Sequence, residues 1–155
     1  MTDVYAGLCT CMVNNPSVFS FLKEDELKTV AHFFTCKTLP ANTTVWKEGE
    51  PGDYAAFIVS GKVQVTRETE FKANKVVLGI YGRGSYIGAM SVLDDTPRST
   101  TAVALESVCI VIITKNNFDR LTLEHPSCST ALMKGMLLTV SKSLNNSIDR
   151  LITIF

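Results

Sequence analysis

The apolar residues near the start of the chain have the spacing of a helix that buries one face. Between residues 24 and 34 they fall three and four positions apart: Leu27, Val30, Ala31 and Phe34. This period predicts a helix that packs on a core. Residues 24–26 are acidic, which suits the positive end of the dipole in the first turn of that helix. The segment 14–17, with its proline, ends any earlier helix.

From Cys36 to Ile113 the pattern changes to short β-prone runs separated by turns. The runs cover residues 44–46, 56–59, 62–66, 76–81, 101–104 and 108–113. Glycine, proline and asparagine punctuate them at 40–42, 49–53, 60–61 and 82–84. Many short strands at even spacing predict a closed or double-sheeted antiparallel architecture and argue against βαβ units.

After Thr114 the helical period returns. A short segment containing Phe118, Leu121 and Leu123 ends at the pair 125–126, and a long final helix is predicted from about residue 127 to residue 152. Its apolar positions keep a spacing of three and four, with Ser147 as the one polar interruption: Met133, Leu137, Val140, Leu144, Leu151 and Ile154. Such a stripe either packs on the rest of the chain or forms a seam with a partner chain.

These elements predict one domain of the mainly β class. A chain of 155 residues with 46% apolar residues is long and apolar enough to bury one core. We expect a double-stranded β-helix, that is, a jelly-roll-like β-roll of about eight strands, with N-terminal helices and a long C-terminal helix. The segments are an N-terminal helical part at 1–35, the roll at 36–114 and C-terminal helices at 115–155.

Charge and hydropathy exclude several classes of protein. Fifteen acidic residues balance fifteen basic residues, so nothing indicates a global attraction to nucleic acid or to an anionic membrane. No apolar run approaches the roughly 20 residues that span a bilayer. The N-terminus lacks the positive region and the apolar stretch of a signal peptide, so the cytoplasm is the expected location.

Two local signatures lie within the predicted roll. The first covers residues 45–53 and 57–63, and the second covers residues 84–93 and 96–101. In this order and at these spacings they resemble the cyclic nucleotide-binding domain of catabolite-activator-type regulators, cyclic-nucleotide-dependent kinases and gated channels. The resemblance covers roughly residues 17–150, nearly the whole chain.

The second signature also makes sense as chemistry. A cyclic phosphodiester carries one negative charge, which a planar guanidinium and backbone amides hold well. Gly84 and Gly88 allow tight turns, and the turn that begins near Ala89 can direct N–H groups at an anion. The resemblance implies that Arg98 is the phosphate-binding arginine; without that pattern, an arginine after a proline is usually a solvated surface residue. The implied ligand site consists of Gly88, Ala89, Met90, Ser91, Arg98 and Ser99.

One position departs from the family pattern. Where ligand-competent members have a glutamate that accepts hydrogen bonds from the ribose 2′-hydroxyl, this chain has Ala89. A hydrogen bond to a charged group contributes about 1.5–3 kcal/mol, so its loss predicts about 10- to 150-fold weaker binding. Three interpretations stay open: weak cyclic-nucleotide binding (cyclic AMP or cyclic GMP), binding of another small anion, or a degenerate fold that serves protein–protein contact.

The cysteines raise a further alternative. Five cysteines, odd in number and scattered, do not indicate a secreted disulfide framework. One branch of the family senses oxygen or redox state through N-terminal cysteines that hold an iron–sulfur cluster, which suggests a redox or metal sensor built on Cys9, Cys11 and Cys36. Their Cys-x-Cys spacing does not fit the common cluster motifs. His32 and Cys36, one helical turn apart, could complete a metal site, but a buried helix face explains both equally well. We expect no metal and no cofactor.

Catalysis has little support in the sequence. His125 is not tied to a nucleophile, and His32 lies on a helix expected to be packed. The sequence has neither a nucleophile motif nor a metal-ligand pair at zincin spacing, so we expect no enzyme. In transcription factors of this family a helix-turn-helix follows the long helix, whereas this chain ends at Phe155; we therefore expect no DNA binding by the chain alone and no membrane partner. Dimeric relatives pair their long helices, which predicts a homodimer through Leu137, Val140, Leu144 and Leu151.

Overall fold

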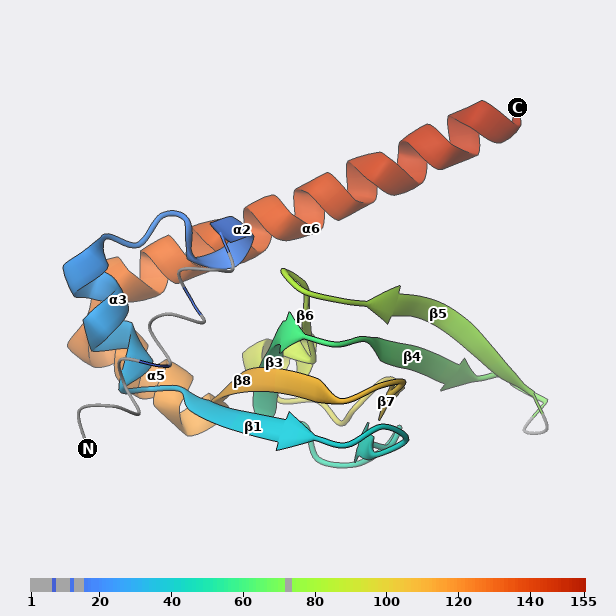
Figure 1. Ribbon diagram of the computed structural model, residues 1–155, viewed down its shortest axis with the longest axis horizontal. Coiled ribbons are helices and arrows are strands. Elements are labelled where there is room, and N and C mark those ends of the chain that lie inside the picture. Colours follow the sequence, from blue (N-terminus) through green and yellow to red (C-terminus); the bar gives the residue numbers. More distant parts are fainter. Residues whose placement is uncertain (1–6, 8–11, 13–15, 72–73) are drawn as a thin grey trace.

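Two four-stranded antiparallel sheets form a roll, and helices cover one side of it (Figure 1). The computed structural model describes residues 7, 12, 16–71 and 74–155. One sheet has the order β1 (Thr35–Leu39), β8 (Val108–Thr114), β3 (Tyr54–Ser60), β6 (Tyr86–Ile87). The other has the order β2 (Thr44–Trp46), β7 (Thr101–Ala104), β4 (Val63–Glu68), β5 (Lys75–Tyr81). The mainly β roll predicted from the sequence is confirmed.

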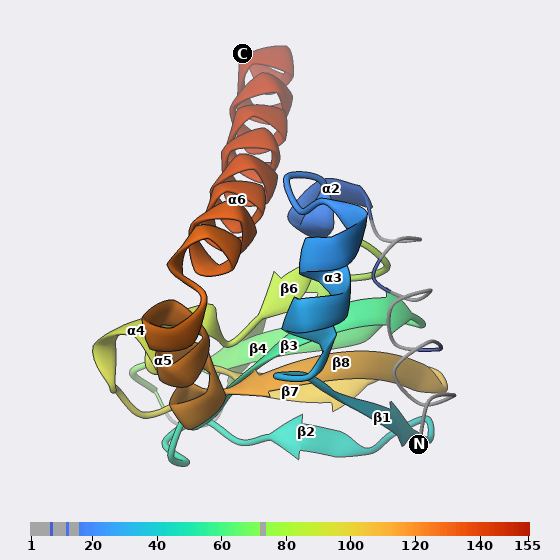
Figure 2. The ribbon, with the colours of Figure 1, turned by 90° about the vertical axis from the view of Figure 1, so that its left-hand side faces the viewer.

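The helices precede and follow the strands, apart from one short helix inside the roll (Figure 2). They are α2 (Pro16–Phe19), α3 (Glu24–Ala31), α4 (Ala89–Asp94), α5 (Lys115–Glu124) and α6 (Pro126–Ile154). The long final helix is confirmed, and Pro126 suits its first turn because a proline there removes no helical hydrogen bond. None of the described helices is long and apolar enough to cross a membrane.

The helix predicted to include Phe34 ends earlier, at Ala31. Residues 33 and 34 turn the chain toward β1, because Thr35 already pairs with Ile112 of β8. Both phenylalanines remain buried, and the Phe34 ring meets the Phe57 ring edge-on at 5.5 Å. Both phenyl groups are therefore buried although the helix has already ended.

Strand β3 is buried on both faces and separates two cores. Phe57 faces a core formed with the helices, whereas its neighbours Ala56 and Ile58 face a second core inside the roll. Successive side chains of a strand point to opposite faces, so a continuous apolar run can serve both cores. Strand β8 divides in the same way, with Val111 in the first core and Ile110 in the second.

Helix α6 consists of a packed half and an exposed half. Near its start, Cys128, Leu132 and Met136 are buried. The backbone of α2 approaches so closely that a Cβ added at Gly135 would lie 1.7 Å from the carbonyl oxygen of Val18. From residue 141 onward every residue is exposed, and Figure 1 shows this end running past the roll.

Candidate functional site

The two sequence signatures meet at the backbone of Arg98. The Gly49 N–H donates to the Arg98 carbonyl oxygen at 2.8 Å, and the Arg98 N–H donates to the Glu50 carbonyl oxygen at 2.8 Å. Beside this pairing, a Cβ added at Gly52 would lie 2.1 Å from the Cβ of Ser91. The turn at 49–52 thus fixes the position of the second signature.

The guanidinium of Arg98 lies inside the roll, enclosed by aromatic rings and carbonyl groups. The residue is 3% exposed. Its Nη1 donates to the Gly88 carbonyl oxygen at 3.1 Å, and its Nη2 donates to the carbonyl oxygen of Tyr54. Its Cζ lies 3.7 Å from the centre of the Trp46 ring and 4.8 Å from that of the Tyr54 ring. Every one of these partners is formally neutral.

Electrostatics make this arrangement unusual. Burial lowers the pKa of Arg98, and Tyr54, Asp53 and Glu50 oppose that effect. An arginine nevertheless stays protonated in a protein, so the charge is buried. Two charge-assisted hydrogen bonds of about 1.5–3 kcal/mol each, and cation–π contacts of about 0.5–2 kcal/mol, offset a desolvation cost of several kcal/mol. These contacts stabilise the positive charge, but none of them is made with a negatively charged group.

Two buried donors next to each other have no protein acceptor. Among the described side chains, the Nε of Arg98 and the Nε1 of Trp46 are buried nitrogen atoms without a hydrogen-bond partner. Buried polar groups are normally paired, so an orphaned donor calls for an explanation such as a ligand. Here the two orphans belong to side chains that stack on one another.

Gly88 allows the stack to form. The residue has φ 78°, in the left-handed region, and precedes α4. A Cβ at this position would lie 2.3 Å from the Nη1 of Arg98 and 2.7 Å from the Cη2 of Trp46. Glycine is therefore required twice, for its backbone angle and for the space it leaves.

The remaining residues of the expected site have diverse surroundings. Ala89 and Ser99 are half-buried, and Met90 is exposed. Ser91 is buried, and its hydroxyl donates to the Pro97 carbonyl oxygen at 3.5 Å. The structure thus brings Gly88 and Arg98 together, while the Ser91 hydroxyl is already bound within the protein.

The sequence did not reveal the aromatic clamp on Arg98. Trp46 and Tyr54 meet edge-on at 5.6 Å, and the Tyr54 hydroxyl donates to the Val45 carbonyl oxygen at 3.3 Å. The one usable signal was the chain's single tryptophan inside the first signature. The side chain that Trp46 contacts depends on where β2 lies relative to the other strands, and the local sequence pattern does not show this.

The cysteine-based alternative gains no support from the geometry. No group of three or more metal-ligating side chains occurs among the described residues. Cys9 and Cys11 lie outside those residues. Cys36 belongs to strand β1, whereas His32 lies at the end of α3, so the idea that a single helical turn relates them is wrong.

Comparison with known proteins agrees with this fold. The sequence profile of the cyclic nucleotide-binding domain matches residues 36–125, more than half of the chain. A cAMP-dependent protein kinase regulatory subunit from Debaryomyces hansenii is 33% identical over 104 residues, which are 67% of this chain and 22% of that protein. The CRP-like cAMP-activated global transcriptional regulator of Mycobacterium tuberculosis is 29% identical over 114 residues, covering 74% of this chain and 50% of that protein.

A solved structure shows the same fold. A cyclic nucleotide-binding domain from Methylobacillus flagellatus superposes with a TM-score of 0.79 at 20% identity, covering 93% of this chain and 85% of that one. The roll, with its helices at both ends, thus defines the fold class of the chain. This chain belongs to the cyclic nucleotide-binding domain family. It spans half or less of the length of the two curated relatives named above.

Proposed function

We propose that this chain is a non-catalytic sensor module that binds a cyclic nucleotide, cyclic AMP or cyclic GMP, through its phosphate at Arg98. The observation that carries the proposal is a buried cation that no carboxylate of the described residues contacts in an ion pair. Ion pairs among the described residues join Lys115 to Asp119 and Arg120 to Glu124, and Arg98 is in neither. A singly charged phosphodiester would supply the missing negative charge and an acceptor for the orphaned Nε.

Two features of the site favour weak binding. Ala89 supplies no carboxylate for the ribose, which removes a hydrogen bond worth about 1.5–3 kcal/mol in ligand-competent sites. Trp46, 4% exposed, covers one face of the guanidinium, so a ligand that reaches Arg98 must move the indole or share the space with it. We therefore expect a Kd of about 1 μM or weaker.

Titration calorimetry with cyclic AMP and cyclic GMP tests the proposal. The chain contains one tryptophan, so intrinsic fluorescence during the same titration reports on the indole beside Arg98. We expect saturable heat together with a change in the Trp46 emission. Arg98→Ala should abolish both signals, and Arg98→Lys, which keeps the charge but loses the planar fork, should weaken binding at least about tenfold.

Arg67→Ala is the matched control, because this arginine is exposed on β4. It should bind like the unmodified protein. Circular dichroism must show that the Arg98 variants are folded; Arg98→Lys serves the test if the alanine variant unfolds. Absence of heat and of a fluorescence change at millimolar nucleotide would rule out the cyclic-nucleotide function.

We further propose that the module acts as a homodimer through an exposed apolar face of α6. The seam residues are 50–67% exposed although all are large and apolar: Leu137, Val140, Leu144 and Leu151. Their spacing of three, four and seven residues places them on one face of the helix, as in a coiled-coil seam. Exposed apolar stripes of this kind mark interaction surfaces.

A second candidate function is protein–protein contact by a roll that has lost its ligand. Strand β5 lies at the edge of its sheet, and apolar side chains are about half exposed on both of its faces: Val76, Val77, Leu78 and Ile80. An edge strand of this composition is a ready surface for another chain. The nucleotide titration separates the two candidates, since only the first predicts binding that depends on Arg98.

A further inference from the structure

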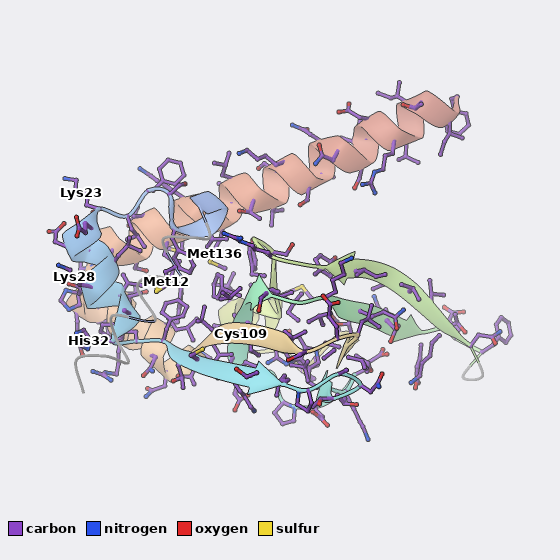
Figure 3. The ribbon with its side chains drawn as sticks, viewed as in Figure 1. Met12, Lys23, Lys28, His32, Cys109 and Met136 are labelled. Carbon is purple, nitrogen blue, oxygen red and sulfur yellow. The ribbon has the colours of Figure 1, made fainter. Side chains whose placement is uncertain are left out.

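Two cysteine thiols face each other on the outer surface of the roll. Cys36 lies on β1 and Cys109 on β8, and their Sγ atoms are 3.5 Å apart. In the register of the two strands Cys36 pairs with Val111, and Cys109 pairs with Thr38. The cysteines are thus diagonal neighbours, two positions apart, and such neighbours lie on one face of a sheet. Figure 3 labels Cys109 beside β1.

The pair is reachable from solvent and is separate from the nucleotide site. Cys36 is exposed and Cys109 is half-buried. The neighbours of Cys109 in sequence, Val108 and Ile110, belong to the core inside the roll, so Cys109 points outward. A reagent can therefore reach the sulfurs without entering the pocket of Arg98.

We propose that Cys36 and Cys109 form a modification site, a dithiol that low-molecular-weight disulfides such as glutathione disulfide oxidise to an intramolecular disulfide. The Cys36 thiolate attacks glutathione disulfide, which forms a mixed disulfide and releases one glutathione. The Cys109 thiolate then attacks the Cys36 sulfur and releases the second glutathione. Two protein thiols are oxidised, one glutathione disulfide is reduced to two thiols, and the two protons pass to the released thiolates.

Formation of the disulfide needs only a small movement, and the edge position of β1 allows it. The sulfurs must approach from 3.5 Å to about 2.05 Å, which side-chain rotation with a slight strand shift can provide. Strand β1 is at the edge of its sheet and pairs only with β8 among the described strands, so it can shift without disturbing a second neighbour. The new bond closes a long loop, from residue 36 to residue 109. Such a bond stabilises the folded state because it restricts the unfolded chain.

Oxidation of a two-cysteine variant tests the site directly. Cys9→Ser/Cys11→Ser/Cys128→Ser keeps only Cys36 and Cys109. After incubation with glutathione disulfide and a quench with N-ethylmaleimide, we expect a monomer that has lost two hydrogens and carries neither glutathione nor maleimide. Its Tm should lie about 5 °C above that of the reduced form.

Adding Cys109→Ser to this variant gives the matched control. It should stop at the mixed disulfide on Cys36, because the resolving thiol is gone. Should the buried Cys128 not tolerate serine, peptide mapping of the oxidised unmodified protein must show a cross-linked peptide containing Cys36 and Cys109. Glutathione retained on both sulfurs, or disulfide-linked dimers in place of the internal bond, would overturn the proposal.

Discussion

The surroundings of Arg98 and the exposed apolar face of α6 depart in opposite directions from the usual rule that charged side chains are exposed and apolar side chains are buried. Arg98 carries a charge and is 3% exposed, whereas Leu137 is apolar and 67% exposed. A buried charge without a counter-ion and an uncovered apolar stripe are both unfavourable for an isolated chain. Our proposals assign a binding partner to each: an anion in the first case and a second copy of the chain in the second. On these proposals, the ligand site and the assembly surface occupy separate parts of one small domain.

The largest effect is expected at Gly88, where the interior site has no spare room. Gly88→Ala adds a Cβ that meets the guanidinium of Arg98 and the ring of Trp46, and it places an L-residue at φ 78°. We expect the free energy of unfolding to fall by about 2–4 kcal/mol, from backbone strain of about 1–2 kcal/mol plus overpacking. Urea unfolding measures the change.

Gly49→Ala separates the two causes of that loss. Gly49 has φ 88°, but a Cβ there would meet nothing within 4 Å. This variant should lose only the backbone contribution, about 1–2 kcal/mol. Equal losses in the two variants would mean that the stack of Arg98 and Trp46 can move aside freely, and the interior site would then be far less constrained than its geometry indicates.

A smaller effect on folding, but a clear one on assembly, is expected at Leu144. Leu144→Glu places a charge in the seam, so we expect a dimeric protein to become monomeric in sedimentation velocity. The unfolding free energy of the monomer should change by no more than about 0.5 kcal/mol, because the side chain is already 60% exposed.

Asn146→Glu is the control for the assembly experiment. Two residues along a helix correspond to about 200° of rotation, so this position adds the same charge on the opposite face of α6. It should leave the dimer intact. An unmodified protein that sediments as a monomer contradicts the seam, and loss of the dimer in both variants would assign the effect to net charge.

The sequence predicted the strands that carry a run of β-prone apolar residues and missed two strands that carry none. Strand β1 was missed because its first four residues are exposed, and three of them are polar, so its apolar pattern is weak. Strand β6 was missed because it has only two residues, inside the predicted phosphate turn. Both strands exist through pairing with distant partners, which periodicity along the chain does not contain.

The same limit applies to the candidate site. Arg98 and Gly88 were predicted from the second signature, because their chemistry is tied to a local turn. The stacking of Trp46 on Arg98 was not predicted, since it joins residues from separate strands. The contact between Cys36 and Cys109 spans 73 positions and depends on the register of β1 against β8. Such contacts follow from tertiary pairing and not from local pattern.

A modest effect on stability is expected where the roll contacts the packed half of α6. Tyr86 lies two residues before Gly88 in the sequence. Its hydroxyl donates to the Met136 carbonyl oxygen at 2.9 Å. Burial raises the pKa of Tyr86 and also that of Tyr54. Above pH of about 10, the ordinary tyrosine pKa, the unfolded chain loses these protons first, so stability falls as pH rises toward the folded values.

Tyr86→Phe should lower the free energy of unfolding by about 0.5–1.5 kcal/mol at neutral pH. The fall of stability between pH 7 and pH 11, measured by urea unfolding, should also become shallower, because only Tyr54 then contributes to it. An unchanged slope would show that the Tyr86 hydroxyl does not connect the roll to α6.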